Sequence, residues 1–285
     1  MKQTDETWTI LKVLTWTSGY LAEKGVENAR REAEWLLCEV TGLDRVGLYL
    51  NFDKPMSDNE LAAYRGLVTR RAKREPLQYI LGSQEFDGLY FEVAPGVLIP
   101  RHDTETLLEQ ALKLAPAARA VLDIGTGSGC LAIALATRLP DASVTAVDLS
   151  PEALTVARRN AERHGVPVEF LCGSFFAPLA GRSFDLIISN PPYITTADMA
   201  CLQPEVRDYE PRLALDGGPD GLNAYRAIVG QAAAHLEPDG WLWFEVGAGQ
   251  AVEVAALLAQ AGFHGIITAT DLGGIERVVG GCHGA

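Results

Sequence analysis

Residues 121–129 read Val-Leu-Asp-Ile-Gly-Thr-Gly-Ser-Gly, a short apolar run that enters a Gly-x-Gly-x-Gly turn. A helix-like stretch, Leu131–Thr137, follows the turn. Glycines tolerate positive φ and let a ligand approach the backbone, and the start of a helix leaves unpaired N–H groups pointing at that ligand. The sequence therefore predicts a strand–turn–helix unit that binds a ligand. Its candidate contacts are Gly125, Thr126, Gly127, Ser128 and Gly129.

The next apolar segment, Ser143–Val147, ends in Asp148, which lies 23 positions after Gly125. An acidic residue at this place can accept hydrogen bonds from ribose hydroxyls. Three interpretations of this unit compete: a dinucleotide-binding fold, an S-adenosylmethionine (SAM) methyltransferase, and a tight turn beside a solvated Asp. The dinucleotide pattern Gly-x-Gly-x-x-Gly fails here, because Cys130 occupies its sixth position.

A further candidate contact follows the segment Val168–Leu171, which we expect to be the third strand. Phe175 comes shortly after this segment and would lie at the same edge of the sheet. It can stack on an adenine ring, and ordinary packing in the core is the alternative.

A second informative stretch follows the apolar run Phe184–Ser189. Asn190-Pro191-Pro192-Tyr193 cannot continue a central strand, because proline has no backbone N–H and fixes φ. Asn190 therefore lies at the carboxyl end of a strand, where open α/β sheets bind ligands. Its side-chain oxygen and the Pro191 carbonyl are two acceptors suited to a planar –NH2 group, with Tyr193 as a flat face beside them. Methyl transfer to an amino group would use these acceptors, whereas a nicotinamide reaction would not. The remaining alternative is a loop without a chemical role.

From Ala120 onward, strand-like and helix-like segments alternate, which is typical of a parallel sheet covered by helices on both faces. The last two predicted strands, 265–270 and 276–280, are separated by only five residues. That connection is too short for a crossover, so we expect the last strand to be antiparallel.

Residues 1–80 are predicted to be helical. The sequence Ser57-Asp58-Asn59-Glu60 is a capping-box pattern that opens one of these helices. The basic run Arg70–Arg74 is interpreted as a solvated face near the end of that helix, and a binding patch is the alternative. Residues 84–93 form a predicted hairpin with Asp87-Gly88 at its turn.

Composition limits the classes of function. The chain has 285 residues and a net charge of −13, while residues 1–83 carry 12 basic and 12 acidic side chains, so the whole excess of acid falls on the remainder. The acidic part of the chain is the one that contains the candidate site, and this disfavours duplex nucleic acid as a partner. Five dispersed cysteines predict reduced thiols in the cytoplasm and no zinc site, and no metal is expected. Residues 1–9 contain no apolar leader, and no apolar run is long enough to span a membrane.

Several motifs occur together and in order, and with them the chain resembles the bacterial HemK/PrmC family, the peptide-chain release factor glutamine N5-methyltransferases. The resemblance spans nearly the whole chain. The Asn-Pro-Pro-Tyr motif alone is shared with adenine-N6 and guanine-N2 nucleic-acid methyltransferases, whereas the combination is highly specific. The motifs are Glu75-Pro76-x-x-Tyr79-Ile80-x-Gly82, Phe86-x-Gly88-x-x-Phe91-x-Val93, Leu98-Ile99-Pro100-Arg101-x-Asp103-Thr104-Glu105, Gly125–Gly129 and Asn190–Ile194.

The resemblance implies a small all-α domain (1–80) that recognises substrate, a β-hairpin linker (81–97) and a seven-stranded Rossmann-like class I SAM-dependent methyltransferase domain (98–285). It implies methyl transfer from SAM, which leaves S-adenosylhomocysteine, to the side-chain amide of the Gln in the Gly-Gly-Gln motif of class I release factors, proteins of translation termination. The alternatives are a nucleic-acid amino-methyltransferase and a SAM-binding interaction protein without turnover.

By the same resemblance, the glycine loop holds the methionine part of SAM, Asp148 the ribose and Phe175 the adenine. Asn190, with the rest of its motif (Pro191, Pro192 and Tyr193), holds the substrate Gln. Arg101 and Glu105 are candidates for clamping the cofactor loop or the substrate loop, and a structural ion pair or helix cap is the alternative. Two departures from the family pattern are Ser174 in place of Asp beside the adenine and His102 in place of Pro.

Overall fold

The computed structural model describes residues 7–284, which fall into two compact units. Residues up to Gly82, together with Pro204–Tyr209, form the helical unit. Residues 83–203 and 210–284 form the sheet unit. Residues 1–6, which make up most of the segment without an apolar leader, lie outside the described residues.

The helical unit has a small apolar core of its own, to which Leu14, Leu36 and Leu37 contribute fully buried side chains. The predicted capping box is confirmed: the Ser57 hydroxyl accepts from the Glu60 N–H, and the Glu60 carboxylate accepts from the Ser57 N–H. The helices are α1 (Ile10–Glu23), α2 (Ala29–Thr41), α3 (Arg45–Leu50), α4 (Asp58–Ala72), α5 (Leu77–Leu81) and α9 (Pro204–Tyr209).

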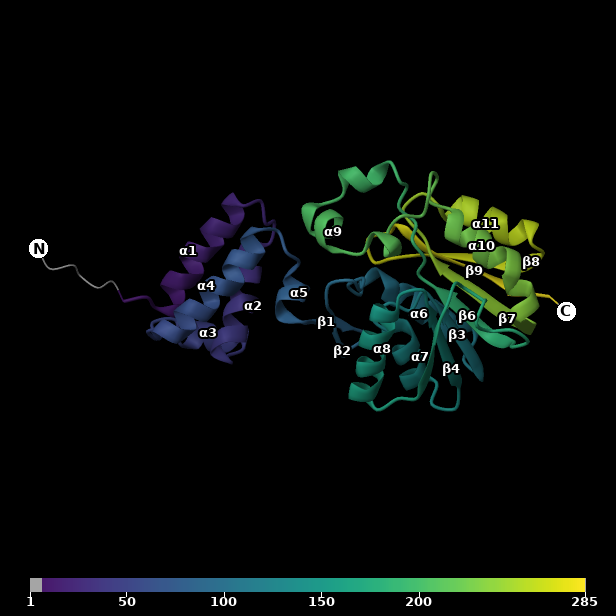
Figure 1. Cartoon of the computed structure of the whole chain (residues 1–285), viewed down its shortest axis with the longest axis horizontal. Coiled ribbons are helices and arrows are strands. Elements are labelled where there is room, and N and C mark those ends of the chain that lie inside the picture. Colours follow the sequence, from purple (N-terminus) through teal and green to yellow (C-terminus); the bar gives the residue numbers. More distant parts are fainter. Residues whose placement is uncertain (1–6, 285) are drawn as a thin grey trace, which may run out of the picture. The chain divides into compact units, whose positions relative to one another are not determined.

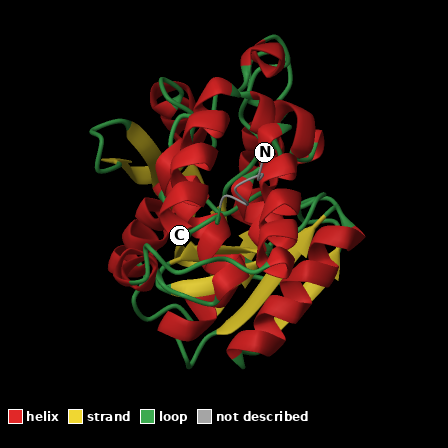
Figure 2. Ribbon diagram, turned by 90° about the vertical axis from the view of Figure 1, so that its left-hand side faces the viewer, coloured by secondary structure: helices red, strands yellow, loops and turns green. Residues whose placement is uncertain are grey.

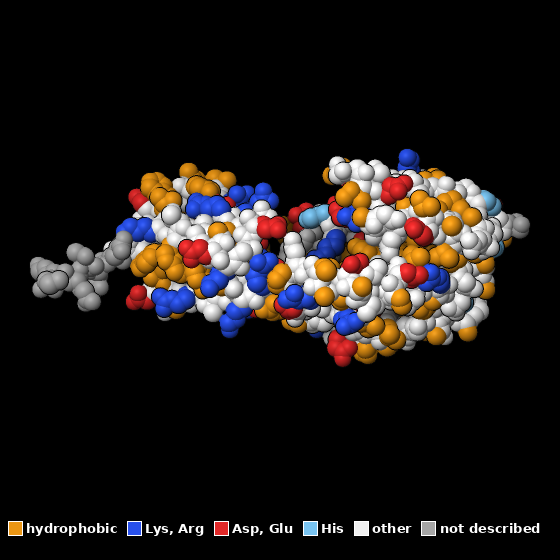
Figure 3. All heavy atoms as spheres, turned by 90° about the horizontal axis from the view of Figure 1, so that it is seen from above, with side chains coloured by type: hydrophobic (Ala, Val, Ile, Leu, Met, Phe, Trp, Pro, Cys, Tyr) orange, Lys and Arg blue, Asp and Glu red, His pale blue; other side chains and the backbone are white. Residues whose placement is uncertain are grey.

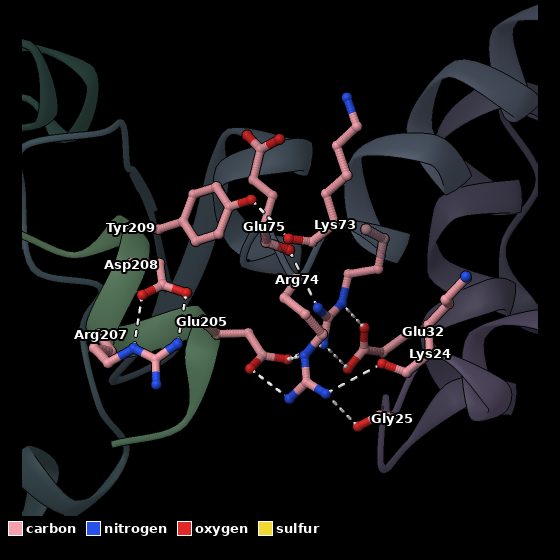
Figure 4. A network of polar contacts seen from close by, with 11 residues as sticks. Lys24, Gly25, Glu32, Lys73, Arg74, Glu75, Glu205, Arg207, Asp208 and Tyr209 are labelled. Carbon is pink, nitrogen blue, oxygen red and sulfur yellow. Dashed lines mark hydrogen bonds and ion pairs between the residues drawn. The ribbon is translucent and has the colours of Figure 1, made fainter. Parts of the chain in front are cut away.

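The interpretation of the basic run at the end of α4 as a solvated face is wrong for Arg71, which is only 4% exposed, whereas Arg70 and Lys73 are exposed. Figure 4 shows how these arginines meet acidic residues within the helical unit. Arg71 pairs with Glu32, and its Nη2 lies 2.8 Å from Glu205 on α9. Arg74 makes a two-pronged contact with the same Glu205 carboxylate, at 2.7 and 2.6 Å. The arginines therefore bind α9 to α2 and α4.

The predicted hairpin is present as β1 (Ser83–Phe86) and β2 (Leu89–Glu92), and it belongs to the sheet unit. Its two turn residues, Asp87 and Gly88, have φ values of 49° and 72°. Positive φ at both positions is the reason for the Asp-Gly sequence, because a type I′ turn requires it.

The sheet unit is built on a seven-stranded sheet with the strand order β5-β4-β3-β6-β7-β9-β8. All pairings among β3 to β7 are parallel, and β9 runs antiparallel to both of its neighbours, as the short final connection predicts. The strands are β3 (Ala120–Ile124), β4 (Ser143–Asp148), β5 (Val168–Cys172), β6 (Phe184–Ser189), β7 (Leu236–Glu245), β8 (Phe263–Thr270) and β9 (Glu276–His283).

Helices cover both faces of this sheet (Figures 1 and 2). Apolar side chains of α6, α7 and α8 pack on one face, and those of α10 and α11 pack on the other. This layering buries the sheet and leaves the strand ends accessible. The helices are α6 (Asp103–Leu114), α7 (Cys130–Arg138), α8 (Pro151–His164), α10 (Asn223–Ala232) and α11 (Ala251–Gln260), with short 3₁₀ turns η1 (Asp198–Cys201), η2 (Arg212–Ala214) and η3 (Ala233–His235).

The last three strands of the chain are longer than the sequence predicts, and β7 begins furthest ahead of its predicted start. The apolar pattern places the start of β7 at Trp241, whereas the strand begins at Leu236. A register shift between Phe184 and Leu186 lets Leu236 pair with Phe184 before the regular ladder resumes at Trp241. A bulge of this kind leaves no periodic signal in the sequence.

Exposed apolar side chains are concentrated on the helical unit, and Figure 3 shows hydrophobic atoms among charged ones on one face of it. Within residues 7–284, no helix is both long and apolar enough to cross a membrane. In the same range no cluster of three potential metal-ligating side chains is present. The exposed large hydrophobic residues of the helical unit are Trp8, Leu11, Trp16, Trp35, Val46, Tyr49, Leu50 and Phe52.

Candidate functional site

A cavity opens in the sheet unit at the carboxyl ends of β3, β4 and β6, the edge where parallel sheets bind ligands. The strand ends come together because β3 lies between β4 and β6. Most of the predicted site residues line this cavity, but Gly129, Pro191, Tyr193 and Glu105 are not among the lining residues found within 7–284. Those that line it are Arg101, Gly125, Thr126, Gly127, Ser128, Asp148, Phe175, Asn190 and Pro192.

The glycine loop has the conformation that its sequence predicts. Gly125, Gly127 and Gly129 have φ values of 76°, 56° and 84°, which side chains with a Cβ rarely adopt. A Cβ at Gly129 would lie 3.1 Å from Ala157 on α8, so this glycine also allows close helix packing. At Gly125 and Gly127 a Cβ would meet nothing within 4 Å, which leaves open space above the loop.

Asp148 holds the loop from the neighbouring strand. One carboxylate oxygen accepts from the Gly127 N–H at 2.8 Å, and the other accepts from the Ser150 N–H at 2.8 Å. Burial raises the pKa of Asp148, and these backbone hydrogen bonds oppose the rise. Each oxygen keeps a second lone pair for a ligand.

Beneath the loop lies a buried acid, Asp123, for which the sequence pattern predicts no role. The Thr126 hydroxyl donates to Asp123 Oδ2 at 2.6 Å. Burial raises the pKa of Asp123 to about 7. Asp123 Oδ1 and the Ser128 hydroxyl are buried without a hydrogen-bond partner among residues 7–284. Ser128 lines the cavity, so its unpaired hydroxyl suits a ligand with polar groups, as SAM has. The sequence signal was an acidic residue inside an apolar strand.

Ser174 and Phe175 form another part of the cavity lining, beyond the end of β5. Phe175 has a φ of 47°, an uncommon backbone conformation for a bulky residue. Its half-buried ring packs against the core below. Stacking on a ligand and packing in the core are therefore compatible roles for this side chain.

Asn190 lines the cavity at the end of β6, and a buried network behind it fixes its position. Its Nδ2 donates to the Thr104 hydroxyl oxygen at 3.2 Å. The Thr104 hydroxyl donates to Glu245 Oε2 at 2.5 Å, and Tyr193 donates to Glu245 Oε1 at 3.4 Å. The sequence motif that contains Thr104 does not indicate a role for it, and Glu245 belongs to none of the motifs. The signal for Glu245 was a carboxylate at the end of an apolar strand, as for Asp148.

Glu245 is 2% exposed, and burial raises its pKa to about 7. The hydrogen bond from Thr104 and the charge of Arg277 oppose this rise. A buried carboxylate that titrates near neutral pH beside a cavity is a feature of functional sites.

The two clamp candidates contact different partners. Arg101 pairs with Glu210, whose other oxygen accepts from the Ile99 N–H at 3.2 Å. Glu210 lies in the long loop 195–221 that follows the Asn190 motif, and it is 6% exposed. Glu105 instead accepts from the Asp87 N–H in the hairpin turn at 3.1 Å and contacts His102.

Comparison with known proteins places this geometry in a family. Residues 12–82 match the model of the PrmC N-terminal domain, and residues 101–205 match that of the methyltransferase small domain. A solved structure described as a methyltransferase from Pyrococcus furiosus is similar in fold, with a TM-score of 0.52 and 21% identity over 70% of this chain and 91% of that one.

Curated relatives extend over almost the full length. The chain is 64% identical over 281 residues to the release factor glutamine methyltransferase of Geobacter sulfurreducens, covering 99% of each chain. It is 44% identical to the release factor glutamine methyltransferase of Chlorobaculum tepidum, covering 90% of this chain and 92% of that one. The protein belongs to the family of release factor glutamine methyltransferases.

Proposed function

We propose that this protein transfers a methyl group from SAM to the side-chain amide nitrogen of the Gln in the Gly-Gly-Gln motif of class I release factors. The observation that carries the proposal is the position of Asn190, which lines the cavity of the glycine loop and whose amide is anchored by a hydrogen bond to Thr104, another lining residue. Full-length identity to named relatives supports the same reaction.

The lining residues fit SAM by their chemistry. Gly125 to Gly129 would hold its methionine part, Asp148 its ribose and Phe175 its adenine. When bound, SAM supplies a strongly electrophilic methyl group on a sulfonium centre, and S-adenosylhomocysteine remains afterwards. No metal is needed for this chemistry.

The substrate amide is a poor nucleophile, because its nitrogen lone pair is delocalised into the carbonyl. Hydrogen bonds from its two N–H groups to Asn190 Oδ1 and the Pro191 carbonyl would hold the nitrogen in line with the methyl group. They would also stabilise the positive charge that develops on nitrogen as the N–C bond forms. Such positioning contributes up to about 7–11 kcal/mol in the best cases. Pro192 and Tyr193 would shape the pocket, and the nitrogen would lose its proton to solvent.

The helical unit is the proposed recognition domain, and residues 81–97, which include the hairpin, are the proposed linker to the catalytic domain. Eight of the fourteen exposed large hydrophobic side chains of the described chain belong to it, although it is the smaller unit. A surface rich in exposed aromatic residues is typical of a protein-binding face. Because its partners would be proteins of translation termination, the proposed site of action is the cytoplasm.

The basic run Arg70–Arg74 is the sequence feature that favours a nucleic-acid substrate. Arg70 pairs with Glu75 at 2.5 Å, and Arg71 and Arg74 pair with Glu205. Arginines already neutralised by carboxylates are poor phosphate contacts. This pairing favours a protein substrate.

The proposal is tested by methyl transfer from labelled SAM to a purified class I release factor. A copy in which the Gln of the Gly-Gly-Gln motif is changed to Glu is the matched control, because Glu keeps the shape and lacks the amide nitrogen. Label on the first protein and none on the second is the expected result. Label on neither, with SAM binding intact, would contradict the proposal, and total RNA and DNA would be the next substrates.

A further inference from the structure

The proposed role of Asn190 depends on which way round its amide lies. Rotation by half a turn exchanges the oxygen and the NH2 group with almost no change in shape. Only the oxygen can accept a hydrogen bond from the substrate N–H, and an NH2 group facing the substrate would repel it. The protein therefore needs contacts that hold Asn190 Oδ1 toward the cavity.

The buried hydrogen bonds of Thr104 determine which way round the Asn190 amide lies. An ionised carboxylate accepts hydrogen bonds and donates none, so the single Thr104 proton goes to Glu245. The Thr104 oxygen is then left as an acceptor only, and the Asn190 group that faces it must be the NH2 group, at 3.2 Å. Asn190 Oδ1 has no hydrogen-bond partner among residues 7–284, so it is available to a ligand.

The fold brings these three residues together. Ser189 pairs with Phe244 in the parallel ladder of β6 and β7, so Asn190, just beyond β6, lies beside Glu245, the last residue of β7. Thr104 reaches them from the first turn of α6. Thr104 is 1% exposed and Glu245 is 2% exposed, so water does not compete for these bonds.

Glu245 is itself held in place. Tyr225 on α10 donates to the Glu245 backbone carbonyl at 2.9 Å, and the Tyr193 hydroxyl contacts the second carboxylate oxygen. The carboxylate is therefore a fixed acceptor.

We propose that Thr104 and Glu245 are positioning residues that orient the Asn190 amide, so that its oxygen faces the substrate. The inference rests on the proposed function and adds to it two residues that act through Asn190: Thr104, which also lines the cavity, and Glu245, which is not among its lining residues within 7–284. It explains why the protein keeps a carboxylate in a buried position where an apolar residue is often at least as stable.

The test compares Thr104→Val with Thr104→Ser. Valine has the shape of threonine without the hydroxyl, whereas serine keeps the donor and acceptor. Thr137→Val is the matched control, because the Thr137 hydroxyl donates to the Ile133 carbonyl of its own helix. We expect Thr104→Val to lower kcat by about tenfold or more, equivalent to about 1.4 kcal/mol in the barrier. Thr104→Ser should stay within about threefold of the parent, with SAM affinity unchanged in both variants.

Glu245→Gln tests the other end of the network. Its amide can donate to Thr104, whose proton is then free to turn to Asn190 Oδ1, so both amide orientations become populated. We expect a fall in kcat of about threefold to tenfold, with SAM affinity by calorimetry and the melting temperature close to the parent values. Equal losses in Thr104→Ser and Thr104→Val, or a fall in SAM affinity that parallels the fall in kcat, would overturn the inference.

A readout without turnover separates the inference from the proposed function. The Asn190 side-chain NH2 signal, identified in an NMR spectrum by its absence from Asn190→Ala, should exchange with solvent slowly in the parent and in Thr104→Ser. It should exchange faster in Thr104→Val and in Glu245→Gln. Equal rates of NH2 exchange in all four proteins would contradict the proposed role of Thr104 and Glu245, whether or not the release factor is methylated. Absence of methylation by the parent, with the exchange pattern as expected, would contradict only the proposed function.

Discussion

The hydroxyl of Thr104 donates a hydrogen bond to Glu245, which is 141 positions further along the chain, and the same oxygen accepts from Asn190. This contact joins the start of α6 to the ends of β6 and β7 at the wall of the cavity, which Thr104 and Asn190 both line. Through this contact, the buried Glu245 carboxylate determines which way round the Asn190 amide lies.

The first prediction concerns the pH dependence of turnover. Below its pKa of about 7, Glu245 carries a proton that it can donate to Thr104, and the Thr104 proton can then turn to Asn190. We therefore expect kcat to be highest above pH 7 and to fall as the pH drops through about 7. The measurement is kcat at saturating substrates from about pH 6 to about pH 9.

The control for this profile is Glu245→Gln, which has no proton to gain and should lose the acidic limb. If both proteins give pH profiles of the same shape, the fall in kcat at low pH is due to the titration of another group. The titratable or charged side chains that act on Glu245, or on which it acts, are Asp103, Arg277, Tyr193, Tyr225 and Cys130.

The second prediction is that Asn190→Ala lowers turnover far more than it weakens SAM binding. Alanine removes the acceptor oxygen, and loss of one preorganised dipole costs roughly 3 kcal/mol in comparable sites, or about a hundredfold in kcat. The measurement is kcat beside the SAM dissociation constant by calorimetry. Activity within a few fold of the parent would remove Asn190 from the mechanism.

The third prediction is that Asp148→Ala weakens SAM binding. The variant loses the proposed acceptor for the ribose and also the acceptor that holds the Gly127 N–H. We expect the dissociation constant to rise by about tenfold or more, equivalent to about 1.4 kcal/mol. Asp148→Asn keeps one acceptor oxygen and should give a smaller rise. Unchanged affinity in both variants would contradict the ribose assignment.

The fourth prediction is that Glu205→Gln destabilises the helical unit. Glu205 accepts from both Arg71 and Arg74, and the nearly buried Arg71 would keep only Glu32 as a charged partner. We expect a loss of about 1–3 kcal/mol in the free energy of unfolding, measured in urea. The exposed Glu237→Gln is the control and should change stability by less than about 0.5 kcal/mol. Equal effects would show that the network contributes nothing.

The fifth prediction links Asp123 to the pH dependence of stability. Its folded pKa of about 7 lies above its ordinary value, so the folded state binds more protons than the unfolded state between about pH 4 and about pH 7. The contribution of Asp123 to stability is therefore greatest at low pH and is lost as the pH rises toward and through 7. Asp123→Asn should flatten this slope and unfold at higher urea than the parent near pH 8. The exposed Asp53→Asn should keep the slope, and a parent-like slope in Asp123→Asn would contradict the assignment.

Local features of the sequence predicted much of the fold. Asp87-Gly88 specified the hairpin turn, and the five residues before β9 specified an antiparallel strand. The glycine loop and Asn190 fell at the ends of parallel strands, so their meeting at one cavity followed from topology.

Contacts between distant residues could not be predicted in the same way. Periodicity reports which side of an element is apolar, but it does not report which carboxylate an arginine reaches. Arg71 therefore appeared to be a surface charge until α9 supplied Glu205. Glu245 shows the same limit, because its partner Thr104 belongs to a helix that the sequence does not place beside it.

The central claim is that the methyl group ends on the side-chain amide nitrogen of one Gln. The most direct measurement is mass spectrometry of the release factor peptide that contains Gly-Gly-Gln, after reaction with the parent enzyme and labelled SAM, followed by acid hydrolysis of that peptide. The account predicts one added methyl group on this Gln and release of labelled methylamine on hydrolysis, because the amide C–N bond breaks while the N–CH3 bond survives. A methyl group on any other atom, or release of the label as methanol from an ester, would contradict it.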